Sequence, residues 1–204
     1  MQAIRYRRHF LTLIPAAILL WLFDKAGDVL HSDDAFLTFA AMGSLHATSL
    51  VLSLRDRHAV SLAKAITFVA LVGALSVLTI FSSLLLVPML SVERTPRLDQ
   101  DVRLLLLLAA GSAFGASGYW LLLRSFWLKL RRFSNLLTTV ALCSVATVVS
   151  WLAAGSLMGS RARDIANLVP TLGWWAAFSF SLYCGDLQWR AEKGIPAASD
   201  KSNC

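Results

Sequence analysis

The residues of this chain that could do chemistry begin with a serine between two glycines. Gly115-Ala116-Ser117-Gly118 lies in the middle of a long apolar stretch, and His46 lies in another. A serine hydroxyl is a weak nucleophile until a neighbouring base takes its proton, and histidine can be that base. Ser117 and His46 together therefore raise the hypothesis of a hydrolase whose site lies among apolar helices.

These four residues resemble the GxSG motif of rhomboid intramembrane proteases, whose core has six helices with the serine on the fourth. The resemblance implies that Ser117 is the nucleophile and gives His46 a place on the second helix. The sequence departs from that family, because no histidine follows Ser117 to act as its base on the sixth helix. The second-helix HxxxN pattern is also missing, since Leu50 lies four residues after His46. The four histidines are His9, His31, His46 and His58.

His46 is also a candidate functional residue without Ser117, because an ionisable side chain within a membrane span is a functional-site hypothesis by default. The alternative is a neutral imidazole that is hydrogen-bonded to a serine, a threonine or a carbonyl of another helix. One histidine cannot form a zinc site or a haem pair, and Cys143, Cys184 and Cys204 have no metal-ligand spacing. No carboxylate lies deep in a span, which disfavours a carboxylate proton relay. We therefore expect no cofactor.

The elements that position these residues follow from composition. Of 204 residues, 57% are hydrophobic and 15% are charged, whereas soluble domains have about 25% charged residues. The net charge of +7 comes from lysines and arginines that lie at the ends of apolar segments. Orientation in a membrane explains that placement, so we expect contact with a lipid bilayer and no direct nucleic-acid binding.

Six apolar segments predict an all-α, polytopic transmembrane helix bundle over residues 1–190, followed by a polar cytoplasmic tail over 191–204. A span needs about 20 apolar residues. The first segment is short, and the third exceeds one span but has no turn cluster, so we count it once. Four or five spans stay possible if the first or third segment lies in the interface. The segments are 10–23, 35–54, 59–92, 104–123, 135–157 and 165–184.

The basic residues predict the orientation. With six crossings and the N-terminus inside, 13 of the 19 lysines and arginines lie on the inner side. Cytoplasmic loops carry the excess of such residues. We therefore expect a protein of the bacterial inner membrane with both termini in the cytoplasm.

The segment 104–123 also predicts helix packing and assembly. Gly111, Gly115 and Gly118 lie near its middle, and small residues let two helix backbones approach closely in a membrane. The sequence leaves open whether these glycines meet a helix of the same subunit or of another. We expect a homo-oligomer.

A basic and aromatic segment, 124–132, follows at the end of this span. Basic residues among aromatic anchors are typical of an interfacial extension that binds anionic lipid headgroups. The other interpretation is a cytoplasmic docking site for a protein partner with an acidic surface. Its candidate contact residues are Arg124, Phe126, Trp127, Lys129, Arg131 and Arg132.

Acidic residues gather between the first two spans and predict a short loop on the outer side. Such a cluster is a solvated connector or, alternatively, an outward-facing surface for recognition or for collecting cations. Its residues are Asp24, Asp28, Asp33 and Asp34.

Three functions are compatible with these features. In size, helix content and lack of a catalytic set, the chain resembles the small membrane subunits of bacterial phage-defence operons, such as the membrane component of Kiwa systems. That resemblance implies a non-enzymatic subunit that oligomerises, senses a disturbance of the membrane and signals to a soluble effector. The first alternative is a small channel or transporter that uses hydroxyls of the second and third spans, and the second is a rhomboid-like hydrolase. The hydroxyls are those of Ser44, Thr48, Ser76, Thr79 and Ser83.

Overall fold

The computed structural model describes residues 6–30, 35–54, 61–87, 99–126, 133–157 and 168–192. This part of the chain is all-helical and without strands, which confirms the all-α part of the predicted fold class. It forms six helices, one for each predicted apolar segment: α1 (Tyr6–Leu30), α2 (Ala35–Leu52), α3 (Leu62–Leu86), α4 (Gln100–Phe126), α5 (Phe133–Leu157) and α7 (Val169–Glu192).

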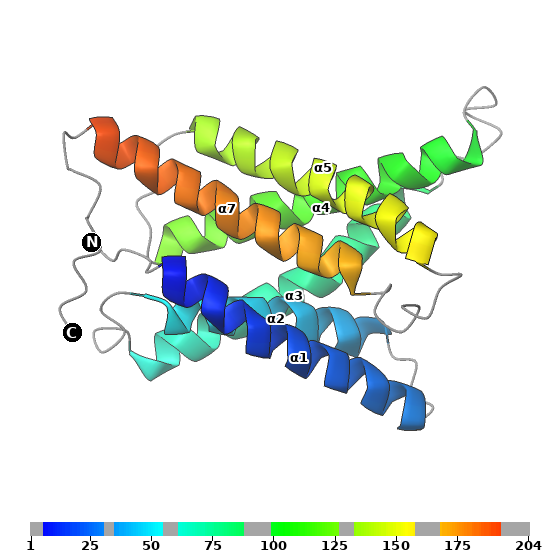
Figure 1. The fold of residues 1–204 in the computed structure, drawn as a ribbon, viewed down its shortest axis with the longest axis horizontal. Coiled ribbons are helices and arrows are strands. Elements are labelled where there is room, and N and C mark those ends of the chain that lie inside the picture. The colour runs from blue at the N-terminus through cyan, green and yellow to red at the C-terminus, as the bar shows by residue number, and fades with distance from the viewer. Residues whose placement is uncertain are drawn as a thin grey trace.

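The six helices form a ring in which each packs against its neighbours in the chain (Figure 1). The ring closes where α1 meets α7, and this contact is looser than the others. Successive helices run up and down, so α1 begins and α7 ends at the same end of the bundle. We call it the basic end, because Arg7, Arg8, Lys64 and Arg124 lie near helix termini there. The opposite end is the far end.

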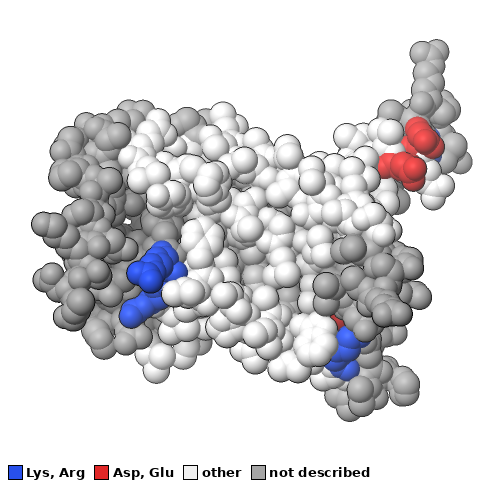
Figure 2. Space-filling model, viewed as in Figure 1, with Lys and Arg blue, Asp and Glu red and all other residues white. Residues whose placement is uncertain are grey.

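The outer surface of the ring is apolar. Leu62 and Leu85 are both 76% exposed, and Val145 on α5 is 62% exposed. On the face shown in Figure 2, charged side chains gather at the two ends and leave an uncharged belt between them. Lipid tails can cover such a belt, whereas contiguous apolar patches of this extent are rare on soluble monomers.

Four helices are long and apolar enough to cross a membrane: Arg7–Ala26, Leu62–Ser83, Gln100–Phe126 and Asn135–Ser156. The apolar part of α2, Phe36–Leu52, is shorter. Of the segment 59–92, the described residues 61–87 contain one long helix, α3. The structure thus supports a multi-pass membrane protein, while six crossings with both termini inside stay a prediction.

Two helix ends differ from the expected ones. The structure continues α1 to Leu30, so Asp24 and Asp28 lie in its last turns and not in a loop. No proline or turn cluster interrupts the chain after Phe23, and adding residues to an existing helix is far easier than starting one. Asp33 and Asp34 lie outside the described residues. At the other end of the chain, α7 extends to Glu192, and 193–204 also lie outside the described part.

Glycines and small hydroxyl residues set the spacing between neighbouring helices. On the α2–α3 interface, Gly43 faces Ser76, and Gly73 faces Ser44 in return. The α5–α7 interface repeats this arrangement with Gly173 against Ser150. Lipid provides no hydrophobic driving force between helices, so close packing of this kind must hold them together.

The three glycines predicted for helix packing all meet α3 of the same chain. Gly111 faces Ser83 and Thr79, and Gly115 faces Thr79. A Cβ atom placed on Gly118 would lie 2.7 Å from Leu75 Cδ1. Among the described residues, the three glycines therefore approach a helix of their own subunit. The homo-oligomer stays a prediction.

We predict that Gly43→Ala destabilises the protein. The added Cβ would lie 2.8 Å from the backbone oxygen of Val72, and overpacking of this kind costs about 1–3 kcal/mol. Gly155→Ala is the matched control, because its Cβ would meet nothing within 4 Å. Thermal unfolding in detergent should show a lower Tm for Gly43→Ala and an equal or higher Tm for Gly155→Ala. Equal melting of Gly43→Ala and the unaltered protein would contradict this packing.

Candidate functional site

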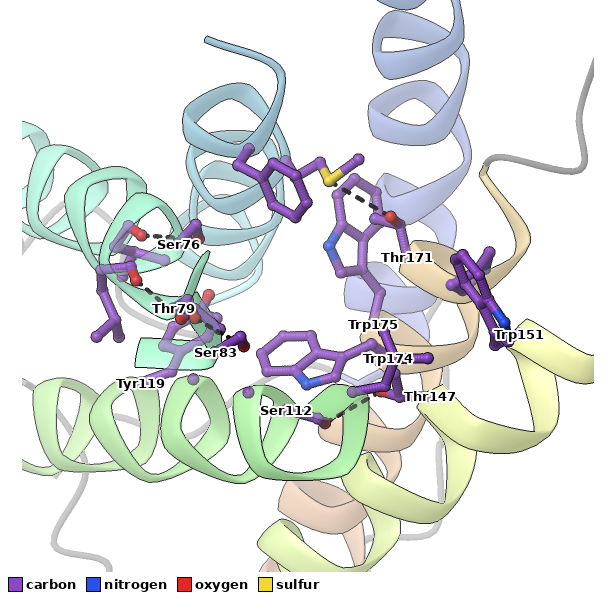
Figure 3. A pocket seen from close by; sticks show the side chains of 18 residues that line it. Ser76, Thr79, Ser83, Ser112, Tyr119, Thr147, Trp151, Thr171, Trp174 and Trp175 are labelled. Atoms are coloured by element: carbon purple, nitrogen blue, oxygen red, sulfur yellow. Dashed lines mark hydrogen bonds between the residues drawn. The ribbon is translucent and has the colours of Figure 1, made fainter. Parts of the chain in front are cut away.

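A pocket of about 400 Å³ lies inside the ring, between α2, α3, α4, α5 and α7 (Figure 3). It occupies the half of the bundle toward the far end, from Pro170 at the start of α7 to Tyr119 on α4. The lining residues recur at the spacing of one helix face. On α3 these are Val72, Ser76, Thr79 and Ser83. The volume falls in the range of small-molecule sites, about 300–1,000 Å³.

The α3 wall of the pocket presents hydrogen-bond acceptors. Ser76 donates its hydrogen to Val72 O at 3.0 Å, and Thr79 donates to Leu75 O at 2.9 Å. Ser83 likewise donates to Thr79 O at 3.1 Å. Each oxygen keeps lone pairs that can accept from a bound molecule. None of the described residues that line the pocket is charged.

The opposite wall is aromatic. Trp174 stacks on Tyr119 with ring centroids 6.1 Å apart and on Phe178 at 5.1 Å. Tyr119 and Phe178 also stack, at 4.5 Å. Trp175 lies beside them in the pocket (Figure 3). A stack of this kind fixes the Tyr119 ring and gives a flat apolar surface for a ligand.

Beyond Tyr119, toward the basic end, side chains fill the interior. Leu50 and Leu54 from the end of α2 pack with Phe68 on α3 and Leu123 on α4, and each is at most 1% exposed. Tyr119 therefore stands at the boundary between an open pocket and a filled core.

His46 is fully buried directly behind Tyr119. Its Nδ1 atom lies 3.0 Å from the Tyr119 hydroxyl, and its Nε2 atom lies 3.3 Å from Ser179 Oγ on α7. The rings of Trp174, Trp175 and Phe178 surround it. This environment matches the alternative in which the imidazole is hydrogen-bonded to hydroxyls of other helices.

A second buried histidine shares the same serine. His9 Nε2 lies 2.8 Å from Ser179 Oγ, and the His9 and His46 rings are 5.7 Å apart. On its other side, His9 Nδ1 lies 3.3 Å from Ser49 Oγ, which is 2.7 Å from Thr12 Oγ1. We call these six residues the histidine chain: Tyr119, His46, Ser179, His9, Ser49 and Thr12.

The histidine chain joins helices that are not all neighbours in the ring. Tyr119 belongs to α4, His46 and Ser49 to α2, Ser179 to α7, and His9 and Thr12 to α1. It is the polar counterpart of a small apolar cluster in which Ala16 and Leu20 of α1 pack on Trp175. Together these contacts fix α1, which closes the ring.

The proposed Ser117–His46 pair is not formed. Ser117 donates its hydrogen to Ala113 O of its own helix at 2.7 Å. The hydrogen bonds of His46 go to Tyr119 and Ser179 instead. Within the described residues, no group of three metal-ligating side chains occurs either.

The basic-aromatic segment is described only at its start. Arg124 is exposed and lies over the Trp120 ring, 5.6 Å from its centroid. Phe126 packs on Phe68, and Lys64 Nζ lies 5.9 Å from the Phe126 ring. Trp127, Lys129, Arg131 and Arg132 lie outside the described residues.

The five hydroxyls that the sequence suggested for a channel or transporter point in different directions. Ser76, Thr79 and Ser83 line the pocket within the chain. Ser44 instead packs against Gly73, and Thr48 is exposed and donates to Ser44 O at 2.8 Å. The small and polar residues of α2 thus do not form one face.

The sequence interpretation missed most of the histidine chain. His9, which follows Arg7 and Arg8, was given no role from the sequence, although it is 0% exposed. A usable signal was present on α2, where His46, Ser49 and Ser53 recur at the three- and four-residue spacing of one helix face. Tyr119 and Ser179 gave no comparable signal, because the polar residues beside them, Ser117 and Ser181, lie two positions away, and residues at that spacing do not face each other on a helix.

We predict that Tyr119→Phe lowers stability by about 1–3 kcal/mol, since it leaves His46 Nδ1 buried without its partner. The ring stacking is kept, so only the hydroxyl is tested. Ser117→Ala is the control and should change stability by no more than about 0.5 kcal/mol. Thermal unfolding in detergent measures both, and a Ser117→Ala loss equal to that of Tyr119→Phe would contradict these assignments.

Comparison of the chain with protein-family models, with curated proteins and with solved structures finds no match. The function is therefore argued from the geometry of the pocket and of the histidine chain.

Proposed function

We propose that this protein is a non-enzymatic membrane subunit that binds a small neutral molecule in its pocket and signals its presence at the basic end. Tyr119 is the observation that carries the proposal. Its ring forms a wall of the pocket, and its hydroxyl holds His46 at 3.0 Å. A molecule that displaces the ring would break that hydrogen bond.

The lining indicates the chemical class of the bound molecule. Trp174, Trp175 and Tyr119 suit a flat or branched apolar body. Ser76, Thr79 and Ser83 offer oxygens that have already donated their own hydrogens. A hydroxyl or amide N–H of the ligand would pair with them, whereas a free carboxylate would find no cationic partner among the described lining residues.

The coupling to the basic end follows from the histidine chain. Ser179 contacts both histidines, so a shift of His46 changes the position of the hydroxyl that holds His9 on α1. The two arrangements are those with the Tyr119–His46 hydrogen bond formed and broken. The ligand can shift the equilibrium between them only by the difference in its affinity for each. α1 begins at the basic end, where α4 also ends. A movement of α1 would therefore change the surroundings of the basic-aromatic segment.

The wider role belongs to the same proposal. By its resemblance to membrane subunits of phage-defence systems such as Kiwa, the protein would form a homo-oligomer in the bacterial inner membrane, with both termini in the cytoplasm. It would sense a membrane disturbance and pass it to a soluble partner on segment 124–132. The apolar outer belt supports the membrane location, and the basic end supports the orientation.

Transport of the same molecule is the second candidate, and the pocket inside a closed ring of helices favours it. It differs from sensing in one respect, which is that the ligand leaves on the opposite side. Liposomes loaded with the bound molecule, once it is identified, separate the two functions.

We predict that Leu108→Trp prevents a small molecule from co-purifying with the protein. Leu108 lines the pocket, and an indole there would occupy its volume. Leu106→Trp is the matched control, because Leu106 lies two residues away on α4 and is 43% exposed. Native mass spectrometry of protein from native membranes should show an added mass in the unaltered protein and in Leu106→Trp only. An identical spectrum for Leu108→Trp would exclude this pocket as the binding site.

We further predict that reversing charge at Arg131 and Arg132, to Glu at both positions, releases a co-purifying cytoplasmic protein. An acidic partner surface would then face two like charges. The double change Arg161→Glu and Arg163→Glu is the control, since these arginines are predicted to lie on the outer side. Affinity purification from the native host measures the loss, and retention of the partner by the Arg131/Arg132 variant would rule out this docking site.

A further inference from the structure

The histidine chain is an unbroken line of groups that each can donate and accept a proton. Neighbouring atoms are 3.0 Å apart between Tyr119 and His46, 3.3 Å between His46 and Ser179, and 2.8 Å between Ser179 and His9. The line continues over 3.3 Å to Ser49 and 2.7 Å to Thr12. A neutral imidazole accepts at one nitrogen and donates at the other, and each hydroxyl does both.

The histidine chain connects the pocket with the basic end. It starts at Tyr119, which lines the pocket and lies seven residues, or about 10 Å, before the end of α4. It ends at the partly exposed Thr12, six residues or about 9 Å into α1. The Thr12 Oγ1 atom lies 3.3 Å from Ser53 Oγ, and Ser53 lies just past the end of α2 at the basic end. The pocket and the histidine chain therefore follow one another along the bundle.

We propose that the histidine chain conducts protons between the pocket and the basic end. This activity goes beyond ligand sensing and does not depend on which molecule the pocket binds. The filled apolar core around Leu50, Leu54 and Leu123 excludes a continuous water column there, so hydrogen-bonded side chains are the available route. The sequence disfavours a carboxylate relay, and this route needs no carboxylate.

The first half of the transfer starts with a protonated water molecule, H3O+, in the pocket. It gives its extra proton to the Tyr119 oxygen as the Tyr119 hydrogen moves to His46 Nδ1, and it is left as neutral water. His46 then releases the hydrogen on Nε2 to Ser179 Oγ. Each group gains one proton and loses one, so none keeps a net charge.

The second half runs along α1. Ser179 passes its own hydrogen to His9 Nε2, and His9 releases the hydrogen on Nδ1 to Ser49 Oγ. Ser49 passes its hydrogen to Thr12, which delivers one proton toward Ser53 and the basic end. The path resets when the hydroxyls rotate and the two histidines return to their first tautomers. One proton enters and one leaves, and no oxidant or reductant is consumed.

Ser179→Ala tests the proposal because it removes the one oxygen that both histidines share. Ser181→Ala is the matched control on the same helix, since Ser181 is also buried but donates to Phe178 O, outside the histidine chain. Purified protein is placed in liposomes that hold a pH-sensitive dye. A potassium gradient with valinomycin then supplies the voltage that drives protons inward.

The unaltered protein and Ser181→Ala should acidify the liposomes faster than protein-free liposomes do. Ser179→Ala should fall to the protein-free rate. If Ser179→Ala does not fold, as judged by thermal unfolding, Tyr119→Phe takes its place, because it removes the first oxygen and keeps the ring. A protein-free rate for the unaltered protein, an undiminished rate for the folded chain variant, or an equal loss in Ser181→Ala would each overturn the proposal.

Discussion

The structure depends on satisfying polar groups inside a ring whose outside is covered by apolar side chains. In lipid, a buried polar group finds no water and must pair with another group of the protein. His46 and His9 meet this requirement through one shared hydroxyl, that of Ser179, at 3.3 and 2.8 Å. These bonds connect α1, α2 and α7 across the interior, where helix packing alone would not define which of several rotations is native.

Between neighbouring helices, small residues hold the structure together by allowing close packing. The pairs of Gly43 with Ser76 and of Gly173 with Ser150 let backbones approach. Ser76 also donates to Val72 O, a carbonyl of its own helix one turn earlier, at 3.0 Å. The described residues that line the pocket accordingly include serines and threonines but no charged side chain.

Much of the fold could be predicted from the sequence, because apolar length and the absence of strand patterns decide it. Of the five hydroxyls singled out from the sequence for a channel or transporter, Ser76, Thr79 and Ser83 line the pocket. The partners of His46 could not be predicted, since Tyr119 and Ser179 are 73 and 133 residues away in the chain. Their meeting depends on how each helix is rotated in the ring, which periodicity within a single helix does not fix.

The closure of the ring by α1 and α7 has a consequence for chain connectivity. Each of the six described helices has two neighbours, and the contact between α1 and α7, the loosest of the six, joins the first and the last of them. Since α1 starts where α7 finishes (Figure 1), a short linker could join these two ends and a new opening could be made in any other connection. The architecture is in this sense cyclic. The order of the helices along the chain decides which neighbouring pair has no connecting loop.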